Sequence, residues 1–243
     1  MEVTTRYGHW QALGLERYEQ VDWRYTNATN DTGYADSANS VRAAGGIVSI
    51  NHPYFTCNRC DWQLPMDYNN AMEVWNGFSG WDIADEKAVK LWQSELVKGK
   101  KITAIGGSDG HAIGELPGRP TTVVGVLGEK SQAAVMQGVK AGRVYIAGKP
   151  GIELKFQVEY SGARLAEMGD TVDAAEGQIL LSTAGITSGA RACIVGENGY
   201  FQNVTVQDGE DIRHAVKGHS FVRVEVRNST DGMLAMTNPI WFS

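Results

Sequence analysis

Apolar and polar positions follow two different patterns along the chain, and the change falls near residue 150. In the first part, short apolar runs alternate with segments in which apolar residues recur at helical spacing. The runs lie at 46–50, 72–75, 102–105 and 121–127, and the helical segments lie at 37–44, 85–98 and 131–141. Alternating strands and helices are typical of parallel strands joined by crossover helices, so residues 1–149 predict an α/β domain.

After Pro150 the pattern changes to segments in which apolar and polar residues alternate with a period of two, which is typical of half-buried strands. Segments with this pattern lie at 154–158, 192–195, 204–206 and 221–226, and turns rich in Gly, Asn and Asp separate them. Several short strands with such turns predict an antiparallel β-sandwich. We therefore expect two domains, 1–149 and 150–243, the second resembling an immunoglobulin-like sandwich.

Composition and charge narrow the function classes. The chain has 243 residues, a hydrophobic content of 42% and a formal net charge of −6, which suits a globular domain and argues against a nucleic-acid partner. We find no apolar run of about 20 residues that could cross a bilayer, and no signal peptide at the start. As written, the sequence therefore predicts a cytoplasmic protein without a membrane partner.

The three cysteines do not form a disulfide framework, because they are few and odd in number. Cys57 and Cys60 form a C-x-x-C pair in a loop-like stretch. This pair is compatible with a local disulfide or free thiols, and also with a metal site, although a second ligand pair at zinc-finger spacing is missing.

Candidate metal ligands follow two of the predicted strands. His52 comes directly after the run that ends at residue 50, and Asp109 and His111 follow the run at 102–105 and two glycines. Because the carboxyl ends of parallel strands form the ligand-binding rim of α/β folds, these side chains can converge. Carboxylate and imidazole together suit Zn, Mn or Fe. The alternative is a buried imidazole with a hydrogen-bonded partner; in isolation, Glu2 resembles a frayed terminal acid and His9 a loop residue.

Six ordered segments carry a resemblance to a known family: EVTT and YGHW within 2–10, INHPY at 50–54, EVWNG at 73–77, GGSDGH at 106–111, AGR at 141–143 and NPI at 238–240. Together they resemble the polymerase and histidinol phosphatase (PHP) superfamily of metallohydrolases, in particular its carbaryl-hydrolase-like branch. The similarity extends over nearly the whole chain.

The resemblance implies a distorted β/α barrel that holds several metal ions, followed in this branch by a β-sandwich. Glu2 matches the glutamate that bridges two metals, and His9 matches the histidine that follows it in the same motif. His52 matches a ligand of a later motif, and Asp109 and His111 match a terminal Asp-x-His pair. These five residues are the metal ligands that the resemblance implies.

One departure from the family concerns the start of the chain. Family members begin with a strand that carries a His-x-His pair, whereas this sequence starts at the second motif. We therefore expect a truncated barrel, one strongly held divalent ion and a weaker second one, and a homo-oligomer that covers the exposed strand edge. Full-length relatives could be exported, but this chain carries no signal.

The expected activity is hydrolysis of phosphomono-, di- or triesters by water activated at the metal. Asp109 or His111 would take the proton from that water or protonate the leaving group. The expected substrate contacts come from Arg119, Arg143, Asn76 and Tyr54; Arg143 is alternatively a charge that complements a helix C-terminus. Two other functions stay open: hydrolysis of carbamates or carboxylic esters, and a non-catalytic fragment that acts as a binding module.

Overall fold

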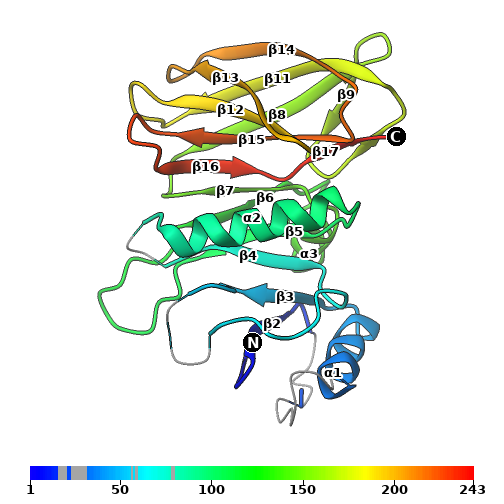
Figure 1. The fold of residues 1–243 in the computed structure, drawn as a ribbon, viewed down its shortest axis with the longest axis vertical. Coiled ribbons are helices and arrows are strands. Elements are labelled where there is room, and N and C mark those ends of the chain that lie inside the picture. Colours follow the sequence, from blue (N-terminus) through cyan, green and yellow to red (C-terminus); the bar gives the residue numbers. More distant parts are fainter. Residues whose placement is uncertain (16–20, 23–31, 56, 58–59, 78–79) are drawn as a thin grey trace.

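The computed structural model describes residues 1–15, 21–22, 32–55, 57, 60–77 and 80–243. These residues form three sheets that are stacked along the long axis of the molecule (Figure 1). A five-stranded sheet with the N-terminus lies at one end, and a four-stranded sheet lies at the other. An eight-stranded sheet and helix α2 (Ile83–Val97) lie between them.

The five-stranded sheet combines an antiparallel hairpin with parallel strands. Its members, in spatial order, are β1 (Glu2–Thr5), β2 (Gly8–Leu13), β3 (Ile47–Asn51), β4 (Ala71–Asn76) and β5 (Thr103–Gly107). β1, β2 and β3 pair antiparallel, whereas β3, β4 and β5 pair parallel. The carboxyl ends of β3, β4 and β5 therefore lie at one edge of the sheet.

Two helices cover this sheet. Helix α1 (Thr32–Ala43) buries Tyr34 and Val41 in a cluster with Val3 and Trp10 from the hairpin. Helix α2 begins after Asp82, whose side chain accepts hydrogen bonds from the first backbone N–H groups in a capping box. α2 buries an apolar stripe that includes Trp92, which packs together with β4 and the eight-stranded sheet.

The other two sheets pack face to face. The eight-stranded sheet contains β6 (Thr121–Val124), β7 (Val144–Ala147), β10 (Thr171–Val172), β12 (Arg191–Gly196), β13 (Gly199–Thr205), β15 (Phe221–Arg227), β16 (Met233–Thr237) and β17 (Ile240–Phe242). The four-stranded sheet contains β8 (Glu153–Tyr160), β9 (Arg164–Glu167), β11 (Glu176–Ala184) and β14 (Asp211–Lys217). One apolar cluster with members from both sheets fills the space between them. This β-rich part is compatible with the predicted β-sandwich.

The prediction of a truncated β/α barrel is wrong. Strands account for 41% of the residues and helices for 16%, and the described strands form several sheets without a closed barrel. The apolar run at 121–127 was expected to be a further parallel strand. Instead β6 pairs antiparallel with β7, and both belong to the eight-stranded sheet. Helix α3 (Gln132–Lys140) connects the two strands in the sequence. An apolar run in the sequence indicates a buried strand, but it does not indicate which other strand that strand pairs with.

The domain boundary at 149/150 stays a prediction, and strands from both sides of it share the eight-stranded sheet. In the part of the chain that the structure describes, no helix is long and apolar enough to cross a membrane.

A buried ionic network joins α2 to the eight-stranded sheet. On β15 the carboxylate of Glu225 contacts the guanidinium groups of Arg223 and Arg227, each at 2.7 Å. Arg223 lies over the ring of Trp92, 4.9 Å from its centroid, and Arg227 pairs with Glu86 at 3.2 Å. Because Trp92 and Glu86 belong to α2, this network fixes the helix that connects β4 to β5.

Candidate metal centre

The hairpin at the start of the chain separates apolar from polar side chains. Val3 and Trp10 are paired across β1 and β2 and are buried against α1. The next pair in the register is Thr4 and His9, and Glu2 lies two residues before Thr4. Side chains alternate between the faces of a strand, so Glu2, Thr4 and His9 share the face opposite α1.

Three side chains converge on the Glu2 carboxylate. Its Oε1 lies 3.4 Å from Nδ1 of His9 and 3.3 Å from Nε2 of His52, and it accepts a hydrogen bond of 3.0 Å from the side-chain amide of Asn51. The imidazole rings of His9 and His52 meet edge to face, with their centroids 5.2 Å apart. The register explains this convergence, because β2 places His9 opposite Asn51 and His52 is the next residue along the chain.

Asp109 and His111 line the same cavity as Glu2, His9 and His52. They follow β5, and ligand atoms of Glu2, Asp109 and His111 lie within 4.8 Å of one another. The cavity has a volume of about 470 Å³. Its lining consists of Glu2, Thr4, His9, His52, Phe55, Cys57, Asn76, Gly77, Ser108, Asp109 and His111. The sequence-predicted ligands therefore do meet, together with Asn76.

Backbone strain coincides with two of these residues. His52 has a φ of 26° and Asp109 a φ of 48°, in the left-handed region that non-glycine residues rarely adopt. Such strain costs about 1–3 kcal/mol per residue and persists where the surrounding structure holds it in place. Here it occurs directly after β3 and shortly after β5, at the two points where the chain presents candidate ligands.

Glu73, which was not among the predicted site residues, lies in the middle of β4. This residue is 7% exposed, and its Oε2 has no hydrogen-bond partner among the described residues. A Cβ atom at Gly107 would lie 2.9 Å from Glu73 Oε1, so the glycine leaves room for the carboxyl group. Burial raises the pKa of Glu73 well above its ordinary value, and the carboxylates of Asp109 and Glu2 raise it further.

The electrostatics of the centre favour a cation. Hydrogen bonds from His52 and His9 hold the pKa of Glu2 far below its ordinary value, so Glu2 is ionised. Its charge adds to that of Asp109 near the buried Glu73, and the described lining of the cavity includes no lysine or arginine. A concentration of carboxyl groups in a low-dielectric environment creates a negative potential that a bound cation would neutralise.

The residues present fit a divalent metal. Glu2, His9 and His52 offer one carboxylate oxygen and two imidazole nitrogens, and their ligand atoms lie within 4.8 Å of one another. This set matches the preferences of Zn, Mn and Fe. The distal ring nitrogens, His9 Nε2 and His52 Nδ1, are buried and lack hydrogen-bond partners in the described structure. His9 Nδ1 and His52 Nε2 face the Glu2 carboxylate, so these are the two ring nitrogens that would bind an ion beside it.

Cys57 and Cys60 form a disulfide, which is one of the alternatives that the sequence left open. The sulfur of Cys60 lies 3.9 Å from Nδ1 of His9, and Cys57 lines the cavity. The disulfide therefore forms part of the wall beside His9.

The other predicted substrate contacts lie elsewhere. Tyr54 is exposed and does not line the cavity. Arg143 lies between α3 and β7, where it pairs with Asp170 at 3.3 Å. Arg119 lines a second cavity, together with Trp75 and Trp81. Of the four predicted contacts, only Asn76 lies in the lining of the metal centre.

Comparisons with protein-family models, with curated proteins and with solved structures found no match to this chain.

Proposed function

We propose that the chain is a metal-dependent hydrolase of phosphoesters. The observation that carries this proposal is the convergence of His9, His52 and Glu2 in a cavity that also contains Asp109 and His111. Glu2, His9 and His52 would hold one divalent ion, and Asp109 and His111 would hold a second, weaker one or act on the substrate directly. A bound divalent ion supplies Lewis acidity and lowers the pKa of water.

The geometry around His111 supports a role in proton transfer. Its Nδ1 lies 2.7 Å from the backbone carbonyl oxygen of Asp109, so Nδ1–H donates to that carbonyl and Nε2 is the nitrogen left for exchange. This hydrogen bond, followed by the charge of Asp109, raises the pKa of His111. A raised pKa favours the protonated ring, which is the form that donates a proton to a leaving group. Asp109 would then accept the proton from the attacking water.

The charge of the cavity narrows the substrate class. A phosphomonoester carries up to two negative charges, and its recognition usually involves arginine or lysine. The carboxylates of Glu2 and Asp109 in the described lining repel a dianionic phosphate, so we propose phosphodiesters and triesters ahead of monoesters. The same observation supports the second candidate, hydrolysis of a carbamate or carboxylic ester, because these substrates are uncharged at the reacting group.

The test combines metal analysis with a substrate series. Protein purified without chelators is analysed for bound metals, and p-nitrophenyl phosphate, bis(p-nitrophenyl) phosphate and p-nitrophenyl acetate are compared as substrates. We expect at least one divalent ion per chain and the highest rate with the diester. A higher rate with the acetate would favour the second candidate, and a chain that binds no divalent ion would refute both.

Two histidine variants make the test specific. His52→Ala removes a central ligand, and His214→Ala removes a histidine on β14, outside the cavity lining. We expect His52→Ala to lose both the metal and the activity, and His214→Ala to keep both. Activity that survives in His52→Ala would have to come from another source and would contradict the proposal.

A further inference from the structure

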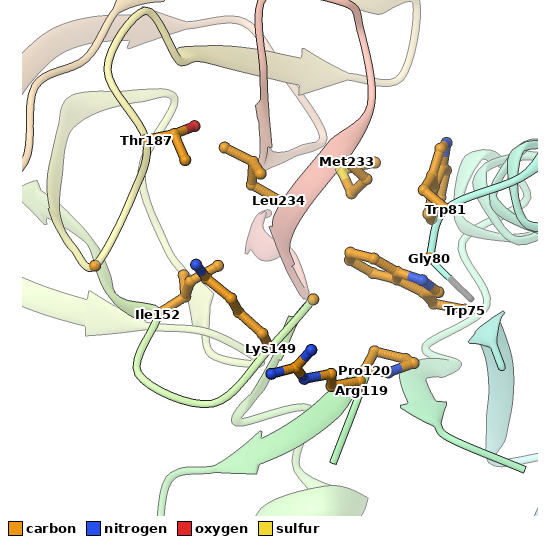
Figure 2. A pocket seen from close by; sticks show the side chains of 12 residues that line it. Trp75, Gly80, Trp81, Arg119, Pro120, Lys149, Ile152, Thr187, Met233 and Leu234 are labelled. Carbon is orange, nitrogen blue, oxygen red and sulfur yellow. The ribbon is translucent and has the colours of Figure 1, made fainter. Parts of the chain in front are cut away.

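A second cavity lies where β4 meets the eight-stranded sheet, and Figure 2 shows the side chains around it. Its volume is about 330 Å³, at the lower end of the range of small-molecule sites. Arg119, Pro120 and Lys149 lie on one side in this view, and Met233 and Leu234 lie on the other. None of its lining residues lines the metal centre.

Two tryptophans form the apolar wall of this cavity. Trp75 is 2% exposed, and its ring meets that of Trp81 edge to face, with centroids 5.0 Å apart. Gly148 makes room for the Trp75 ring, because a Cβ atom there would lie 2.6 Å from the ring carbon Cη2. Pro120 and Met233 extend the apolar surface. Because Trp75 is almost completely buried, the half-buried Trp81 offers most of the indole surface of this wall to a flat aromatic group.

Two cations complete the lining. The side chains of Arg119 and Lys149 are exposed at the cavity, and neither forms an ion pair within the described residues. The chain has more acidic than basic residues, with a formal net charge of −6, so cations without a carboxylate partner stand out. A guanidinium group pairs with carboxylate or phosphate oxygens through two parallel hydrogen bonds, and an ammonium group adds a second positive charge.

We propose that this cavity binds a small organic anion with an aromatic body, such as an aryl carboxylate. The aromatic part would lie against Trp75 and Trp81, and the anionic group would face Arg119 and Lys149. The same surface disfavours cations, for which the charges have the wrong sign, and neutral aromatic molecules, which leave the two cations unpaired. The inference does not depend on the metal centre.

Isothermal titration calorimetry on metal-depleted protein tests the proposal with two probes of the same shape. 2-Naphthoate carries the anionic group, and 2-naphthamide replaces it with a neutral one. We expect the anion to bind at least about tenfold more tightly, and high salt to reduce this preference because the two cations are exposed. Equal affinity of the two probes would overturn the proposal.

Three variants locate the binding. Arg119→Gln should weaken binding of 2-naphthoate about tenfold, while Lys130→Gln, a charge removal outside the cavity, should leave it unchanged. Thr187→Trp places a large ring in the cavity from an exposed loop position and should abolish binding without loss of the folded state, as judged by circular dichroism. Unchanged binding in Thr187→Trp would show that the anion binds elsewhere and would refute the assignment.

Discussion

Replacing Glu225 with glutamine tests how helix α2, which connects β4 to β5, is held against the eight-stranded sheet. Glu225 is 1% exposed, and Arg223 and Arg227 on either side are 2% and 3% exposed. Tyr200 donates a further hydrogen bond of 2.5 Å to the same carboxylate. Glutamine keeps the shape of the side chain and removes its charge, so the variant isolates the electrostatic contribution from packing.

The expected loss follows from the burial of both arginines. Removing one partner of a buried ion pair costs about 3–5 kcal/mol, because an uncompensated charge then stays buried. Arg227 keeps its contact with Glu86, whereas Arg223 has no second carboxylate partner within the described residues. We therefore expect a decrease of about 3 kcal/mol in the free energy of unfolding of Glu225→Gln, near the lower limit of that range.

Urea denaturation followed by circular dichroism measures this loss, and Glu176→Gln is the matched control. Glu176 pairs with Lys217 at 3.0 Å on the surface, where the side chains are 66% and 78% exposed. Surface pairs contribute about 0–1 kcal/mol, so the control should change little. If the two variants lose the same free energy of unfolding, the buried network does not stabilise the fold as argued.

The pH dependence has a definite sign. Burial alone would raise the pKa of Glu225, but the charges of Arg223 and Arg227 outweigh burial and hold the pKa below its ordinary value. A depressed pKa contributes stability that is present above the unfolded-state value and is lost as the pH falls through the folded-state value. The stability difference between the wild type and Glu225→Gln should therefore shrink as the solution is acidified below about pH 4.

Three further predictions concern the two cavities. Glu2→Gln should raise the dissociation constant for a divalent ion at least about tenfold in a chelator competition assay, and unchanged affinity would exclude Glu2 as a ligand. Because the pKa of Glu73 is raised in the folded state, the buried carboxyl group lowers the free energy of unfolding as the pH rises above the ordinary value of 4.5. Metal-free Glu73→Gln should therefore be more stable than the wild type above about pH 4.5, as measured by urea denaturation. Gly148→Ala should displace the Trp75 ring, cost about 1–3 kcal/mol of unfolding free energy and weaken anion binding, with calorimetry as the readout.

Hydrophobic periodicity correctly predicted three strands and one helix in the first half of the chain. The runs at 46–50, 72–75 and 102–105 became β3, β4 and β5, and the helical segment at 85–98 became α2, within one or two residues. The hairpin of β1 and β2 was missed, although Val3, Thr5, Trp10 and Ala12 are buried in strict alternation with more exposed neighbours. That alternation was the available signal, and the polar start of the chain concealed it.

The candidate metal ligands were predictable for a different reason. His52 and Asp109 follow buried strands, and the ends of parallel strands share one edge of a sheet, so adjacency in the fold could be argued from position alone. Arg119 and Arg143 were chosen by charge without such an argument, and neither lies in the metal centre. Glu73 was overlooked, although a carboxylate within an otherwise apolar buried strand is itself unusual.

One irregularity in β4 lies among the residues that this strand presents to the two cavities. Glu73 pairs with Ile105 on β5, whereas Trp75 pairs with Gly106, so two residues of β4 advance while β5 advances by one. In a regular strand Glu73 and Trp75 would point to the same face, and an inserted residue reverses this relation. The irregularity therefore lets Glu73 approach Gly107 near the metal centre while Trp75 lines the cavity of Arg119 on the other side. Asn76, the next residue, lies in the metal-centre lining again. A single strand thus supplies side chains both to the negatively charged cavity, which suits a cation, and to the positively charged cavity, which suits an anion.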